Sequence, residues 1–122
     1  RNKNVYVRTV IPSLFSEENR NRLKAEIQAI IDIAVGFADR GIIANIRGMM
    51  ERQDRTKVLE KGAFEKLIIH GELDEVILKK DAESMARLNE NVSLEVVKNI
   101  SHMGHLEAPQ LCLSLISEFC KN

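Results

Sequence analysis

Two short runs rich in β-branched residues limit the fold of this chain most strongly. Lys66 to His70 (KLIIH) is an almost uninterrupted apolar run that ends at Gly71, and Ser93 to Ile100 (SLEVVKNI) is a second run of similar character. Both have the length and composition of strands. About 21 residues separate them, and Asp81 to Leu88 in that stretch has the spacing of a modest helix. A helical crossover of this kind makes two strands parallel.

A parallel sheet of two strands is a poor independent structure. Parallel strands are usually buried on both faces and have further strands beside them. The sequence supplies one neighbour for the run 66–70, although its apolar character calls for two. We therefore expect the sheet to be completed from outside this chain, by an absent N-terminal half, a second chain or a swapped copy of this one.

The first sixty residues are predicted to be helical. Pro12 disfavours a continuous helix through the apolar residues around it. Ser16 is a suitable N-cap for a long helix that Gly36 ends. A second helix follows, and Pro109 opens a last one at a favoured position. We assign the apolar stripes of these helices to packing; the stripe of the second helix consists of Ile42, Ile43, Ile46, Met49 and Met50.

Composition excludes several classes of partner. Of the 122 residues, 44% are hydrophobic and 30% charged, so the chain can form a core. The formal net charge is zero, which predicts binding neither to nucleic acid nor to a membrane. Cys112 and Cys120 lie about 12 Å apart if both are on one helix, too far for a disulfide. We expect two reduced thiols packed against a core, and hence a cytoplasmic protein. The start at Arg1 predicts no secretory signal and no native translation start.

Polar residues follow both predicted strands. Asp74 lies just after the first strand and His102 just after the second. Functional groups collect beyond the carboxyl ends of parallel strands, so we expect these two side chains to face each other. A carboxylate there can fix the tautomer of an imidazole and stabilise its charged form. The second ring nitrogen is then free to take a proton from a nucleophile.

These residues also carry a resemblance. Gly71-Glu72-Leu73-Asp74, then His102 and Glu107-Ala108-Pro109, resemble the C-terminal signature of the α/β-hydrolases, in which the acid precedes the histidine. Arg47 to Leu59 resembles the segment that leads from the cap back to the sheet, and Val5 to Ser16 the end of a helical cap. The resemblance covers nearly the whole chain and is most specific over residues 47–109.

The resemblance implies an α/β fold: the C-terminal part of an α/β-hydrolase, with a cap-derived segment at residues 1–60 and a β-α-β-α part of the core at 61–122. Asp74 would be the acid and His102 the base of a catalytic triad acting on an ester, amide or similar acyl substrate. No G-x-S-x-G occurs, so the nucleophile would lie outside this chain, which alone would be inactive. Neither a metal nor an organic cofactor is implied.

Three departures and several alternatives accompany this interpretation. Ser101 replaces the usual glycine before the histidine, Glu75 and Leu78 replace frequent prolines, and the nucleophile elbow is missing. Glu107 is interpreted as a structural acid that braces the histidine loop or caps the last helix. His70 is interpreted as a core residue with satisfied hydrogen bonds.

Other functions remain open at this point. A zinc site of His102, His105 and Glu107 is an alternative, although the spacing matches no strong zinc motif. A second is a non-catalytic binding or assembly module that pairs through its open sheet edge, with a homodimer as one form. A third is acyl transfer, haloperoxidation or dehalogenation on the same fold, because nucleophile and substrate choice lie in residues outside this chain.

Overall fold

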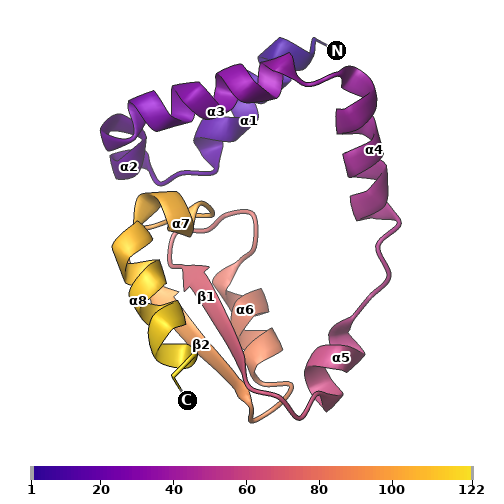
Figure 1. Ribbon diagram of the computed structural model, residues 1–122, viewed down its shortest axis with the longest axis vertical. Helices are drawn as coiled ribbons and strands as arrows, with labels where there is room; N and C mark the ends of the chain where they lie inside the picture. Colours follow the sequence, from indigo (N-terminus) through magenta and orange to yellow (C-terminus); the bar gives the residue numbers. More distant parts are fainter. Residues whose placement is uncertain (1, 122) are drawn as a thin grey trace.

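The computed structural model describes residues 2–121 and divides them into a helical layer and a small α/β layer (Figure 1). The helical layer contains α1 (Lys3–Ser13), α2 (Glu17–Arg22) and α3 (Lys24–Gly36). The α/β layer contains β1 (Lys66–Gly71), α6 (Lys79–Ala86), β2 (Val92–Val97), α7 (Gly104–Glu107) and α8 (Pro109–Phe119). α4 (Asp39–Met50) and α5 (Thr56–Lys61) lie to one side in Figure 1 and connect the helical layer to the α/β layer along the chain.

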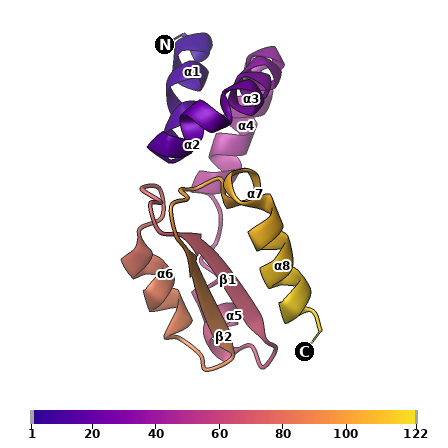
Figure 2. The same cartoon turned by 90° about the vertical axis from the view of Figure 1, so that its left-hand side faces the viewer.

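The predicted parallel pairing of the strands is confirmed. β1 and β2 are parallel, with Lys66 opposite Val92 and Gly71 opposite Val97. α6 covers one face of this pair and α8 the other (Figure 2). Within residues 2–121 the sheet has two strands, and Lys66 to Ile69 of β1 stay half-buried. The apolar strand is therefore only partly covered by the described residues.

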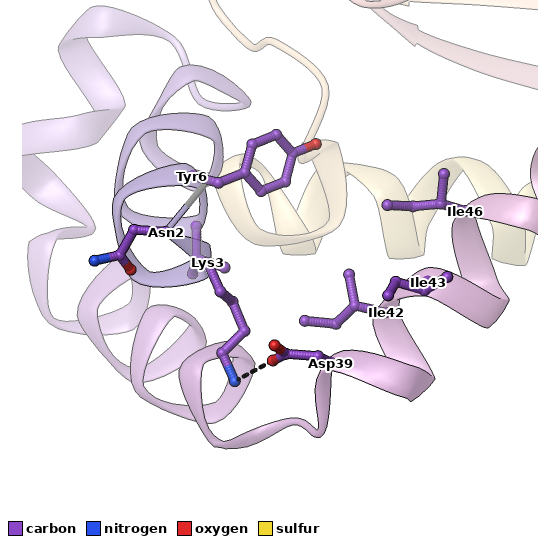
Figure 3. Close-up of a pocket in the computed structure, with 8 residues that line it drawn as sticks. Asn2, Lys3, Tyr6, Asp39, Ile42, Ile43 and Ile46 are labelled. Carbon is purple, nitrogen blue, oxygen red and sulfur yellow. Dashed lines mark ion pairs between the residues drawn. The ribbon is translucent and has the colours of Figure 1, made fainter.

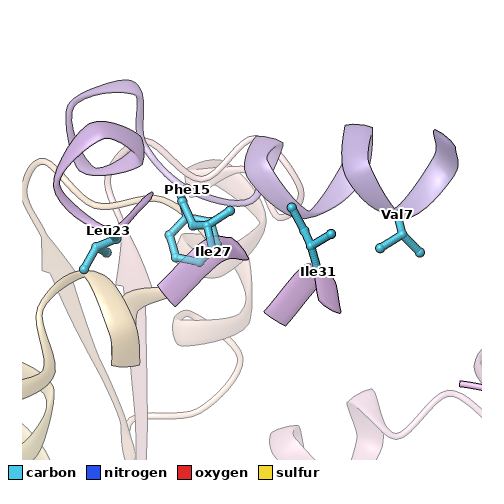
Figure 4. Packing of buried hydrophobic residues seen from close by; sticks show 5 residues of the cluster. All are labelled: Val7, Phe15, Leu23, Ile27 and Ile31. Atoms are coloured by element: carbon cyan, nitrogen blue, oxygen red, sulfur yellow. The ribbon is translucent and has the colours of Figure 1, made fainter. Parts of the chain in front are cut away.

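The core of the helical layer is an apolar cluster that reaches the α/β layer. Its buried members come from α1, α3 and the turns around α2 (Figure 4): Val7, Phe15, Leu23, Ile27 and Ile31. Met103 and Leu106, which lie at and within α7 of the α/β layer, pack against the cluster. Burial of these side chains stabilises the contact between the layers, by roughly 1.5–3 kcal/mol for each large one.

Several predicted helix bounds are wrong. α1 continues through Pro12 and ends one residue later, so the helix lacks the backbone bond that residue 12 would donate to the carbonyl of Arg8. The helix predicted from Ser16 to Gly36 is broken at Leu23, whose φ of −104° and ψ of 26° end α2. Asn19 and Leu23, on either side of the end of α2, are both buried. The short helices α5 and α7 were not predicted from the sequence.

The packing predicted for α4 is not found in this chain. None of residues 39–50 is buried, and Met50 is 80% exposed. The apolar stripe exists, but among the described residues of α4 only Ile42 is half-buried. The two cysteines are free; Cys112 is buried as predicted, whereas Cys120 is exposed. None of the helices between residues 2 and 121 combines the length and the apolar character needed to cross a membrane.

Candidate active site

The structure brings Asp74 and His102 together at the carboxyl ends of the strands. His102 Nδ1 lies 2.9 Å from Asp74 Oδ2. The Asp74 side chain is 7% exposed and that of His102 35% exposed. A deeply placed carboxylate thus holds the inner nitrogen of a ring whose outer part is open. This is the arrangement that the sequence predicts for an acid and a base of a triad.

The loop after β1 fixes the acid. The N–H of Asp74 donates to the carbonyl of Gly71 at 3.1 Å, which closes a turn. Asp74 Oδ1 accepts from the N–H groups of Val76 (2.8 Å) and Ile77 (3.0 Å). One carboxylate oxygen is therefore bound to the loop, and the other is left to accept from His102.

These contacts set the charge of Asp74. Burial is the largest single influence and raises its pKa, but the hydrogen bonds from His102, Ile77 and Val76 lower it, and the net pKa lies below the ordinary value. An ionised Asp74 can only accept, so Nδ1 of His102 carries the proton of the shared hydrogen bond. Nε2 of His102 is then the nitrogen that can accept a proton from another group.

The histidine loop, residues 99–107, begins with a residue in the left-handed backbone conformation. Asn99 has a φ of 60°, which asparagine tolerates better than most residues and which turns the chain out of β2. Its carbonyl accepts from Ser16 Oγ and Asn19 Nδ2, both at 3.2 Å. Further along the loop, the N–H of His102 donates to the carbonyl of Leu14 at 3.0 Å. The α1–α2 corner, residues 14–19, thus holds the loop at Asn99 and at His102.

Glu107 braces the histidine loop, as predicted. It is only 4% exposed. Oε1 accepts from the N–H of Ser101 at 2.8 Å, and Oε2 accepts from the N–H of Ser16 at 2.9 Å and from Asn19 Nδ2 at 3.0 Å. Burial, the largest influence, raises the pKa of Glu107, but these hydrogen bonds outweigh it and lower the pKa. Arg22 completes the network through the Glu107 carbonyl, 2.6 Å from its Nη2.

The zinc alternative is not supported. Both carboxylate oxygens of Glu107 face N–H donors of the protein, and Nδ1 of His102 faces Asp74. Within residues 2–121, no cluster of three or more His, Cys, Asp or Glu side chains is placed to hold a metal ion.

The prediction for His70 is wrong in one respect: the residue is buried in β1, but its Nε2 has no hydrogen-bond partner among the described residues.

Two cavities differ in their relation to the Asp74–His102 pair. One of about 230 Å³ is lined by both residues and by His70, with apolar side chains of α6 behind them. Another of about 430 Å³ lies between α1 and α4 (Figure 3), where Lys3 Nζ and Asp39 Oδ1 form an ion pair of 3.1 Å. The larger cavity is lined by neither Asp74 nor His102, so we connect chemistry only with the smaller one.

No protein-family model matches the chain, and no curated protein matches it by sequence. Solved structures do resemble it. A thermophilic esterase from Thermogutta terrifontis matches with a TM-score of 0.88 and 24% identity over 98% of this chain and 44% of its own. A bromoperoxidase from Bacillus anthracis matches with 0.85 and 20% over 100% and 45%.

An enol-lactonase from Burkholderia xenovorans also matches, with a TM-score of 0.87 and 16% identity over 98% of this chain and 45% of its own. The chain thus spans less than half the length of these structures. All three have the α/β-hydrolase fold. With the parallel pair β1–β2, the α6 and α8 layers and the helical layer above them, the chain has the fold of the C-terminal part of an α/β-hydrolase.

Proposed function

We propose that this chain is the C-terminal part of a hydrolase that acts on an ester, amide or similar acyl substrate. His102 is the general base and then the general acid, and Asp74 orients it. The observation that carries the proposal is the 2.9 Å hydrogen bond between His102 Nδ1 and an Asp74 carboxylate whose other oxygen is bound by two backbone N–H groups. The nucleophile and the oxyanion-binding amides come from the part of the protein outside this chain.

The completing part of the protein pairs with the open edge of β1. That edge has unpaired backbone groups and half-buried apolar side chains, both of which favour addition of a strand. The N-terminal half of the same protein is the proposed partner, and a swapped copy in a homodimer is the alternative. The free cysteines support a reducing compartment, for which we propose the cytoplasm.

The test of the triad uses the full-length protein and p-nitrophenyl acetate. His102→Ala and Asp74→Asn are expected to lower kcat by about 10³- to 10⁴-fold. His105→Ala is the matched control, since His105 is an exposed histidine of the same loop with no hydrogen bond to Asp74. Turnover by His102→Ala equal to that of the unchanged protein would exclude the triad and leave the assembly function.

The intact mass of the purified protein tests the partner. A species heavier than 13.8 kDa, or a second chain beside this one, supports completion by an N-terminal half. A single species of 13.8 kDa that elutes as a dimer supports a swapped copy instead.

A further inference from the structure

Ser101 connects the acid loop, which follows β1 and contains Asp74, to the histidine loop. It lies directly before His102 and is 6% exposed. Its Oγ donates to the carbonyl of Leu73 at 3.1 Å, and Leu73 lies directly before Asp74. Its N–H donates to Glu107 Oε1 at 2.8 Å. The side chain of Ser101 therefore joins the residue before His102 to the residue before Asp74.

The two loops are also in direct contact on either side of this hydroxyl. The N–H of Leu73 donates to the carbonyl of Ile100 at 2.9 Å. At Gly71 the carbonyl oxygen of Ser101 comes so close that a Cβ there would collide with it. Only a residue without a side chain fits at Gly71, and the hydroxyl of Ser101 adds a side-chain bond to the backbone bond that holds the two loops together.

We propose that Ser101 is a positioning residue whose hydroxyl fixes the alignment of His102 against Asp74. This inference rests on the proposed function. Oδ1 of Asp74 is bound within its own loop, so His102 depends on Oδ2 alone. The strength of that hydrogen bond falls steeply with distance and angle, and both are set by how the two loops sit against each other.

The residue type matters at this position. A glycine at this position would keep the N–H bond to Glu107 but would have no hydroxyl to reach Leu73. The hydroxyl of Ser101 thus joins the loops in addition to the backbone bond from the N–H of Leu73 to the carbonyl of Ile100. Ser101 therefore acts through His102 and Asp74 and contacts no reacting atom.

The test compares Ser101→Ala with Ser114→Ala in the full-length protein. Ser114 is an exposed serine on α8 and serves as the matched control. We measure kcat and KM with p-nitrophenyl acetate, the proton resonance of His102 Nδ1–H by NMR, and the melting temperature. In Ser101→Ala we expect kcat to fall about tenfold with KM unchanged, since misplacement of a catalytic group by a fraction of an ångström has this order of effect. The Nδ1–H resonance is expected to move upfield and to exchange faster with water.

The outcomes separate this inference from the proposed function. If His102→Ala abolishes turnover but Ser101→Ala has the kcat and Nδ1–H resonance of the unchanged protein, the inference is wrong and the function stands. A lower melting temperature with an unchanged resonance would likewise make Ser101 merely structural and overturn the inference. If His102→Ala is fully active, the function fails; the Nδ1–H resonance still decides whether Ser101 aligns the pair.

Discussion

Replacement of Glu107 by glutamine tests how the histidine loop is held. The change keeps the shape of the side chain but turns one accepting oxygen into an NH₂ group. Oε1 faces the N–H of Ser101, and Oε2 faces the N–H of Ser16 and Asn19 Nδ2. An amide has one accepting oxygen, so its NH₂ must face at least one of these donors whichever way it turns.

The orientation of lower free energy keeps the two hydrogen bonds at Oε2 and leaves the N–H of Ser101 without an acceptor. A buried donor without a partner costs about 1–3 kcal/mol. The two remaining bonds lose their charged acceptor, which lowers each by about 1 kcal/mol. We therefore expect Glu107→Gln to lower the free energy of unfolding by about 3–5 kcal/mol at pH 7.

The pH dependence has a definite sign. The folded-state pKa of Glu107 lies below its ordinary value of 4.5, so its contribution is complete above about pH 5.5 and is lost as the pH falls through the folded pKa. The difference between the unchanged protein and Glu107→Gln is thus expected to shrink as the pH falls from 5.5 through the folded pKa. Urea denaturation of the full-length protein at several pH values measures it, with Glu118→Gln on the exposed side of α8 as control. Equal stability of the two proteins at pH 7, or a difference that persists in acid, would refute the reasoning.

Two further predictions concern the acid loop. Gly71→Ala is expected to destabilise the full-length protein by several kcal/mol in urea denaturation, because the new Cβ would collide with the Ser101 carbonyl; Gly48→Ala, with open space around it on α4, should raise stability by up to about 1 kcal/mol. An equal effect of both changes would contradict this account. In a ¹³C NMR titration, the pKa of Asp74 should lie below 3.8 and rise in His102→Ala, because the ring no longer donates; an unmoved pKa would mean that Val76 and Ile77 alone lower it.

Much of the α/β layer could be predicted from the sequence because its signals are local. The β-branched run at β1, the crossover helix and Pro109 at the start of α8 each have a short pattern with one favoured structure. The meeting of Asp74 and His102 then follows from topology, because carboxyl ends of parallel strands share one edge of a sheet. The 2.9 Å hydrogen bond confirms their predicted proximity; their catalytic roles stay a prediction.

The helical layer was less predictable because its details depend on distant partners. The break at Leu23 has no glycine or proline signal; it accompanies the inward turn of Asn19 toward Glu107, 88 residues away. The apolar stripe of α4 predicts burial but not the surface that provides it, and this chain leaves the helix exposed. The sequence predicts a buried His70 with satisfied hydrogen bonds. It does not show where the partner lies, and residues 2–121 supply none for Nε2.

The hydrogen bonds to the histidine loop make the helical layer part of the machinery that positions His102. The boundary expected near residue 60 falls between segments that are joined at Leu14, Ser16 and Asn19, each of which bonds directly to residues 99–107. A movement of the α1–α2 corner relative to residues 99–107 would therefore strain or break the bond from the N–H of His102 to the carbonyl of Leu14. If His102 is the base that we propose, substitutions at this corner should alter kcat as well as KM, because they act on the position of His102.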